Sequence, residues 1–197
     1  LLHREADVTK SGGIADFLAH VKAGRVRPVY KSATPPHVEL DDDAVTEVVG
    51  STFESIALSP AKDVFVNFYD KKCGQCQKLA PIWNELGRAV NASDWRSRGV
   101  VIARMDGIEN ESEEDLKSSG FPRLVLFPAV SADKKIKLKR VYKGPYELDP
   151  LLDFVFDAAR NLQGVADAGV GAGSKGKKYN MVERELERRR QEGAREL

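Results

Sequence analysis

Two cysteines, the only ones in the chain of 197 residues, lie two residues apart in VFVNFYDKKCGQCQKLAPIW, residues 64–83. Such a pair can bind a metal, alternate between dithiol and disulfide, or pack in a hydrophobic core. The seven residues 64–70 are mostly β-branched or aromatic, which predicts a buried strand. From Cys73 to Val90 apolar residues recur at helical spacing, with Pro81 expected to kink the helix. We therefore expect the pair where a strand ends and a helix begins.

A cysteine at a helix N-terminus meets unsatisfied backbone N–H groups and the positive end of the helix dipole, which favour its thiolate. Cys73 has this position, and Lys71 and Lys72 add positive charge beside it. Cys76 follows one turn inside the helix, where we expect it to be more buried and within disulfide reach of Cys73. The arrangement predicts redox chemistry.

The residues alone leave two other interpretations open. A structural zinc site needs four ligands, and the histidines, His3, His20 and His37, all lie outside the segment that holds the cysteines. We therefore expect no metal. The two cysteines could also be inert core residues. Two cysteines cannot form a network of several disulfides, so the chain is not a small protein stabilised in that way.

Composition is that of an ordinary soluble chain, with 42% hydrophobic residues, 31% charged residues and a net charge of +1. A nearly neutral chain gives no support for a nucleic-acid partner. No apolar run reaches the roughly 18 residues of a bilayer-spanning helix, so we expect no membrane partner either.

The order of the predicted elements indicates the fold class. Strands and helices follow one another as β-α-β-α-β-α-β-β-α, which predicts an α/β fold with a central mixed β-sheet flanked by helices on both faces. The predicted strands are residues 45–49, 64–70, 99–106, 123–129 and 136–144, and the predicted helices in this domain are residues 51–58, 73–90, 111–120 and 148–162.

Four segments differ in composition. Residues 1–24 contain one more predicted helix, at 11–23, and residues 25–43 are rich in proline and acidic residues, which is typical of a linker. Residues 44–162 hold the alternating strands and helices. Residues 163–197 are first glycine-rich and then highly charged, which predicts a flexible, solvated tail. Because the chain does not begin with Met, we interpret it as a fragment or a processed piece.

The stretches FVNFYDKKCGQCQKLAPIW, VVIARMD, SSGFPRLVLFP and RVYKG together resemble the thioredoxin family, and more narrowly the last catalytic domain of protein disulfide isomerases. The resemblance covers residues 40–162 and implies a thioredoxin-like fold with thiol–disulfide oxidoreductase or isomerase activity and no cofactor. It further implies the endoplasmic reticulum lumen, protein and peptide substrates with thiols or disulfides, and an upstream oxidase or glutathione. Residues 1–24 would then be the end of a preceding thioredoxin-like domain.

Carried onto this chain, the resemblance makes Cys73 the nucleophile that forms a mixed disulfide with a substrate. Cys76 would resolve that mixed disulfide, so that Cys73 and Cys76 form a redox-active disulfide. Pro122 matches the family's cis-proline, which lies opposite the pair and lets substrate backbone bind beside it.

Five positions depart from the family pattern or bear on such a departure. Lys72 and Gln75 replace the Trp and the His of the family's Trp-Cys-Gly-His-Cys, so the histidine that stabilises the thiolate is missing. Asn67 replaces a buried Glu that accepts the proton of the resolving cysteine. Arg104, which neighbours that Glu in the family, must find another partner or turn outward, and Tyr146 falls at or near a family Arg. The departures predict a weaker oxidant that releases substrate slowly.

Two alternative functions remain. One is a thioredoxin-type reductase, which a redox potential near −270 mV rather than −180 mV would indicate. The other is a peptide-binding chaperone module with weak redox activity. Two short glycosylation sequons also occur, at Asn91 and Asn110.

Overall fold

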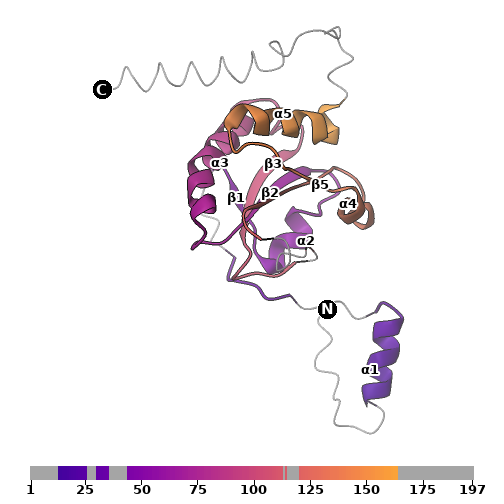
Figure 1. Cartoon of the computed structure of the whole chain (residues 1–197). Coiled ribbons are helices and arrows are strands. Elements are labelled where there is room, and N and C mark those ends of the chain that lie inside the picture. The colour runs from indigo at the N-terminus through magenta and orange to yellow at the C-terminus, as the bar shows by residue number, and fades with distance from the viewer. Residues whose placement is uncertain (1–12, 26–29, 36–43, 113, 115–119, 164–197) are drawn as a thin grey trace, which may run out of the picture. The chain divides into compact units, whose positions relative to one another are not determined.

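The computed structural model describes residues 13–25, 30–35, 44–112, 114 and 120–163. The chain divides into two units, Leu1–Tyr30 and Lys31–Leu197. In the first unit the described helix is α1, Gly13–Lys22, which buries none of its residues (Figure 1). No helix among the described residues is long and apolar enough to cross a bilayer. The exposed apolar residues of α1 are Ile14, Phe17, Leu18 and Val21.

The second unit is built on a mixed sheet with the order β1-β3-β2-β4-β5 among the described residues. Both β1 and β2 run parallel to β3, whereas β4 is antiparallel to β2 and β5 is antiparallel to β4. The predicted α/β fold with a central mixed sheet is therefore confirmed. The strands are β1 Thr46–Glu47, β2 Asp63–Tyr69, β3 Val100–Asp106, β4 Arg123–Phe127 and β5 Arg140–Val141.

Helices cover both faces of this sheet (Figure 1). Apolar residues of α3 and α5 pack on one face, and those of α2 and α4 pack on the other. The helical segments are η1 Gly50–Thr52, α2 Phe53–Ile56, α3 Gly74–Ala92, α4 Ala132–Leu138, α5 Leu148–Ala158 and η2 Arg160–Leu162. α3 continues through Pro81 as one helix.

Side chains alternate along β2, as the two-residue period of a strand requires. Val64, Val66 and Phe68 join the cluster that contains α2, whereas Phe65 packs in the cluster that contains α3 and α5. Asn67 lies two residues beyond Phe65 and therefore shares its face. This polar residue is thus placed under α3, which carries the second cysteine.

The strand predicted over residues 136–144 is largely wrong. Residues 136–138 belong to α4, and only Arg140 and Val141 pair in the sheet. The helix is favoured because the Ser131 carbonyl accepts the N–H groups of Lys134 (2.9 Å) and Lys135 (3.1 Å). The buried Lys135 ammonium also donates to the carbonyl oxygens of Ala57 (3.1 Å) and Lys62 (2.7 Å). The short apolar alternation in this stretch could not predict these hydrogen bonds of Lys135.

Asn110 ties the segment before the domain to the domain itself. Its buried Oδ1 accepts the N–H groups of Ala33 (2.8 Å) and Gly50 (3.0 Å), and its Nδ2 donates to the Asp106 carbonyl (3.0 Å). Residues 31–33, predicted as linker, therefore lie against the domain. The helix predicted over 111–120 falls mostly outside the described residues.

Candidate active site

Cys73 is the N-cap residue of α3 and has extended backbone angles. Its sulfur accepts the backbone N–H of Cys76 at 3.2 Å and lies 3.5 Å from the carbonyl oxygen of Phe121, to which it donates. The Cys73 side chain is half-buried, so its sulfur remains reachable from solvent. The strand-to-helix position expected for this cysteine is the one observed, and it places the sulfur among helix-terminal N–H donors.

Cys76 lies one turn further into α3 and is only 5% exposed. Burial, and then a hydrogen bond with the Cys73 side chain, raise the pKa of its thiol to about 11. The backbone N–H of Asp70 donates to the Cys76 sulfur and opposes that rise. The two cysteine side chains are therefore in contact, one reachable and one buried as a protonated thiol.

The turn before the cysteines is held by Asp70. Its Oδ1 accepts the backbone N–H of Lys72 at 2.8 Å, and its carbonyl accepts the N–H of Cys73 at 3.1 Å. Lys71 forms an ion pair with Asp106 at 3.2 Å. Lys72 is exposed, as is Gln75 in the first turn of α3. Sequence reasoning missed Asp70, although an Asp followed by a turn is a recognisable signal for this side chain–backbone bond.

Pro122 lies next to the pair through its neighbour Phe121. The Phe121–Pro122 peptide bond is cis, as the resemblance implied. The Phe121 carbonyl contacts the Cys73 sulfur, so the start of β4 faces the N-terminus of α3. Arg123 follows and donates to buried Glu114 at 2.6 Å, and Lys139 pairs with the same carboxylate. These ion pairs anchor the residue that directly follows Pro122.

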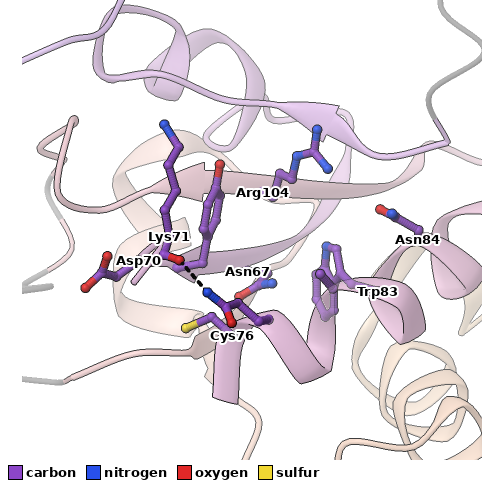
Figure 2. A pocket seen from close by; sticks show the side chains of 10 residues that line it. Asn67, Asp70, Lys71, Cys76, Trp83, Asn84 and Arg104 are labelled. Atoms are coloured by element: carbon purple, nitrogen blue, oxygen red, sulfur yellow. Dashed lines mark hydrogen bonds between the residues drawn. The ribbon is translucent and has the colours of Figure 1, made fainter. Parts of the chain in front are cut away.

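Asn67 reaches the buried side of the cysteine pair from β2. It is 4% exposed, and its Oδ1 has no hydrogen-bond partner among the described residues. It lines a cavity of about 250 Å³ together with Cys76, Trp83 and Arg104 (Figure 2). The indole of Trp83 is itself fixed by a hydrogen bond to the Ala103 carbonyl at 3.0 Å. A buried amide oxygen thus points into a space beside the buried thiol.

Arg104 has found another partner, which was one of the two outcomes expected for it. Its Nε donates to Oε2 of Glu47 at 2.5 Å, across the β1–β3 pairing. The Tyr69 hydroxyl lies 3.4 Å from the other oxygen of Glu47. Burial, and then the Glu47 carboxylate, raise the pKa of Tyr69 to about 12. Glu47 was not foreseen, because a two-residue strand carries no pattern that predicts its neighbours.

Tyr146 is also brought near the cysteines. Burial first, and then the neighbouring Cys76 and Cys73 side chains, raise the pKa of its phenol. The side chain is nevertheless 37% exposed, so it lies at the rim rather than in the core. The arrangement as a whole combines a reachable thiol, a buried thiol and a cis-proline. Among the described residues, no three His, Cys, Asp or Glu side chains are grouped so as to bind a metal.

Known proteins are similar in sequence to the part of this chain that holds the cysteine pair. The thioredoxin family model matches residues 44–155, which is more than half of the chain. Protein disulfide-isomerase A4 of Bos taurus is 33% identical over 80% of this chain and 23% of its own length. Protein disulfide-isomerase of Arthroderma benhamiae is 34% identical over 80% of this chain and 28% of its own length. Protein disulfide-isomerase of Oryctolagus cuniculus is 34% identical over 83% of this chain and 30% of its own length.

This chain therefore spans between 23% and 30% of the length of these relatives. The fold, the strand-to-helix position of the cysteine pair and the matched residues all agree with one another. The chain belongs to the thioredoxin family.

Proposed function

We propose that this chain is a thiol–disulfide oxidoreductase and isomerase that forms and rearranges disulfides in proteins through Cys73 and Cys76. The supporting observation is the contact between a reachable thiol at the N-terminus of α3 and a buried thiol one turn further along. The similarity to proteins named protein disulfide-isomerase supports the same activity.

The reaction begins when the Cys73 thiolate attacks a substrate disulfide. A Cys73–substrate disulfide forms, and one substrate sulfur leaves as a thiolate. Cys76 then loses its proton and attacks the Cys73 sulfur, which forms the Cys73–Cys76 disulfide and releases the second substrate sulfur. Isomerisation occurs when a substrate thiol attacks the mixed disulfide first. In the oxidised state the same steps run in reverse and donate a disulfide to the substrate.

Substrate backbone binds beside Pro122 in this proposal. The start of β4 already faces the Cys73 sulfur through the Phe121 carbonyl, so an extended peptide bound there would bring its own sulfur to Cys73. Exposed Lys72 replaces a family Trp on this approach. With no histidine at Gln75 and no carboxylate at Asn67, the pair is a weaker oxidant and resolves substrates slowly.

The partners follow from this chemistry. Substrates are proteins and peptides with thiols or disulfides, and an upstream oxidase or glutathione restores the pair after each turnover. The similarity to disulfide isomerases supports the endoplasmic reticulum lumen as the compartment. The uncovered apolar residues of α1 support assignment of residues 1–24 to the end of a preceding domain, followed by a linker at 25–43 and a tail at 163–197.

Refolding of a protein with scrambled disulfides tests the proposal. The intact chain should restore native disulfides, Cys73→Ser should abolish this, and Cys76→Ser should accumulate mixed disulfides with the substrate. If Cys73→Ser keeps full refolding activity, the chain is a peptide-binding chaperone instead. A measured redox potential near −270 mV would identify a thioredoxin-type reductase rather than an isomerase, whose potential lies near −180 mV.

A further inference from the structure

The cavity beside Cys76 is larger than a single water molecule requires. It measures about 250 Å³, whereas one water needs only about 10–15 Å³ on this kind of measure. Its walls come from three elements: β2 supplies Asn67 and Tyr69, α3 supplies Cys76 and Trp83, and β3 supplies Arg104. It therefore has room for a small organic molecule between the sheet and α3 (Figure 2).

Two buried groups line this cavity: an amide oxygen without a hydrogen-bond donor in the described part of the chain, and a thiol that must lose its proton to react. The Oδ1 atom of Asn67 accepts no hydrogen bond from the described residues, and such a buried acceptor costs about 1–3 kcal/mol. The Cys76 thiol must lose a proton before it can attack Cys73, yet burial holds that proton firmly. A ligand that takes a proton from sulfur and then offers an O–H to an amide oxygen would satisfy both groups.

Two cations and one carboxylate line the cavity. Lys71 and Arg104 are cationic, and Asp70 is the one carboxylate among the lining residues. Arg104 is paired with Glu47 and Lys71 with Asp106, so each of the two cations is balanced by a carboxylate. In Figure 2 the Asp70 carboxylate is drawn pointing away from Asn67 and Trp83. A ligand at the Asn67 end would thus lie away from the Asp70 carboxylate.

We propose that this cavity is a binding site for a small monocarboxylate, which acts as a diffusible general base for Cys76. This inference rests on the proposed function. The carboxylate first accepts a hydrogen bond from the Asn67 Nδ2 group. It then takes the proton of Cys76, and the resulting carboxylic acid donates its O–H to Asn67 Oδ1.

The step balances without any further reactant. The S–H bond of Cys76 breaks and an O–H bond forms on the carboxylate. The Cys76 thiolate attacks the Cys73 sulfur, the Cys73–Cys76 bond forms, and the bond from Cys73 to the substrate sulfur breaks. The electron pair leaves on the substrate sulfur, which takes up a proton from the carboxylic acid or from solvent. The cysteine pair is oxidised by two electrons and the substrate disulfide is reduced.

Formate is the probe for this site, and the intact chain is the protein. A disulfide-bonded chromogenic aryl thiol first forms a mixed disulfide at Cys73, and release of the second aryl thiol reports attack by Cys76. Its rate is measured against formate concentration at constant pH and ionic strength, with chloride as the replacing anion. We expect a saturable rise of about tenfold, less than the 10²–10⁴ of a positioned side chain.

Two variants separate binding in the cavity from catalysis in bulk solution. Asn67→Leu removes the amide and fills the space, and Ala80→Leu narrows the cavity from an exposed position of α3. Both should lose the response to formate. Ala132→Leu is the matched control, because it makes the same change at an exposed position of α4, and it should keep the response. Ala80→Leu also provides the test if Asn67→Leu fails to fold.

The outcomes are distinct. A saturable response in the intact chain and in Ala132→Leu, lost in Ala80→Leu, supports the site. No response, or a linear response of equal slope in all variants, overturns it while leaving the redox pair intact. Absence of any second release, with or without formate, instead overturns the proposed function itself.

Discussion

Only two residues separate Cys73 from Cys76 in the sequence, but the two side chains have different surroundings. The first sulfur lies half-exposed among N–H donors at the start of α3, and the second is buried between α3 and β2. This asymmetry arises from the helix itself, because one turn moves a side chain from the helix end to the face that packs on the sheet. In the proposed reaction, attack and resolution therefore fall to different sulfurs.

Alkylation should reveal this difference directly. With a pKa of about 11, the Cys76 thiol is three pH units from its midpoint at pH 8, so roughly one thousandth of it is thiolate. In Cys73→Ser, modification of Cys76 by iodoacetamide should be slow at pH 8 and should still rise about tenfold per pH unit up to pH 10. A plateau near pH 8.5, as for a free thiol, would contradict the buried environment.

Asn67 should limit resolution, since an amide cannot accept the proton of Cys76. Asn67→Glu places a carboxylate in the cavity, and turnover in disulfide refolding should rise by about tenfold or more. Asn67→Gln has the same length as Glu without its charge and is the matched control, for which no such gain is expected. Unchanged turnover in Asn67→Glu would mean that proton removal from Cys76 is not limiting.

At the scale of elements, buried polar groups join segments that apolar packing alone would leave loosely connected. Asp63, at the start of β2, accepts N–H groups from Ala129 (2.7 Å), Arg160 (2.9 Å) and Asn161 (2.8 Å). The ends of β4 and α5 are thus tied to the central strand. Lys135 performs the same role for α4 through the carbonyl oxygens of Ala57 and Lys62.

Lys135 should give the domain an unusual pH dependence. Burial lowers the pKa of its ammonium to about 8 from 10.5. Between these values the unfolded chain binds more protons than the folded one, so this residue makes the free energy of unfolding rise with pH. The test is urea unfolding of the intact chain and of Lys135→Met at pH 7.5 and at pH 9.5. The free energy of unfolding of the intact chain, taken relative to that of Lys135→Met, should be higher at pH 9.5 than at pH 7.5. An unchanged difference would contradict the lowered pKa.

Sequence patterns predicted the elements with strong periodicity and missed those set by single contacts. The runs in β2 and β3 and the apolar spacing of α3 and α5 gave the mixed sheet and its two helical layers. The helix α4 was missed because its cause is a Ser131 carbonyl and one lysine that bonds to distant carbonyl oxygens. The cysteine pair and Pro122 were identified from motifs, whereas Glu47 and Asp70 act through tertiary or turn contacts that carry no periodic signal.

At the scale of the whole chain, the two sequons differ in accessibility. Asn91 is exposed near the end of α3, and its Oδ1 accepts a hydrogen bond from Arg96 at 2.8 Å. Asn110 is buried, with both ends of its amide engaged by backbone groups. A glycan on Asn110 would have to displace residues 31–33 from the domain.

Secretory expression should therefore yield folded chain with a glycan on Asn91 and none on Asn110. Glycopeptide mass spectrometry of the intact chain, with Ser93→Ala and Ser112→Ala as paired sequon controls, checks this. Only Ser93→Ala should change the mass of the folded product. A glycan on Asn110 in monomeric, folded material would contradict the buried position of that side chain.

The sheet ends at both sides in very short strands, β1 with two residues and β5 with two residues. Each carries a charged side chain that is already engaged: Glu47 of β1 with Arg104, and Arg140 of β5, whose guanidinium lies 5.4 Å from the centre of the Phe154 ring. Short edge strands with charged side chains give another chain few backbone groups with which to pair as an added strand. The two edges of this sheet are in this way protected from pairing with extended segments of other polypeptides.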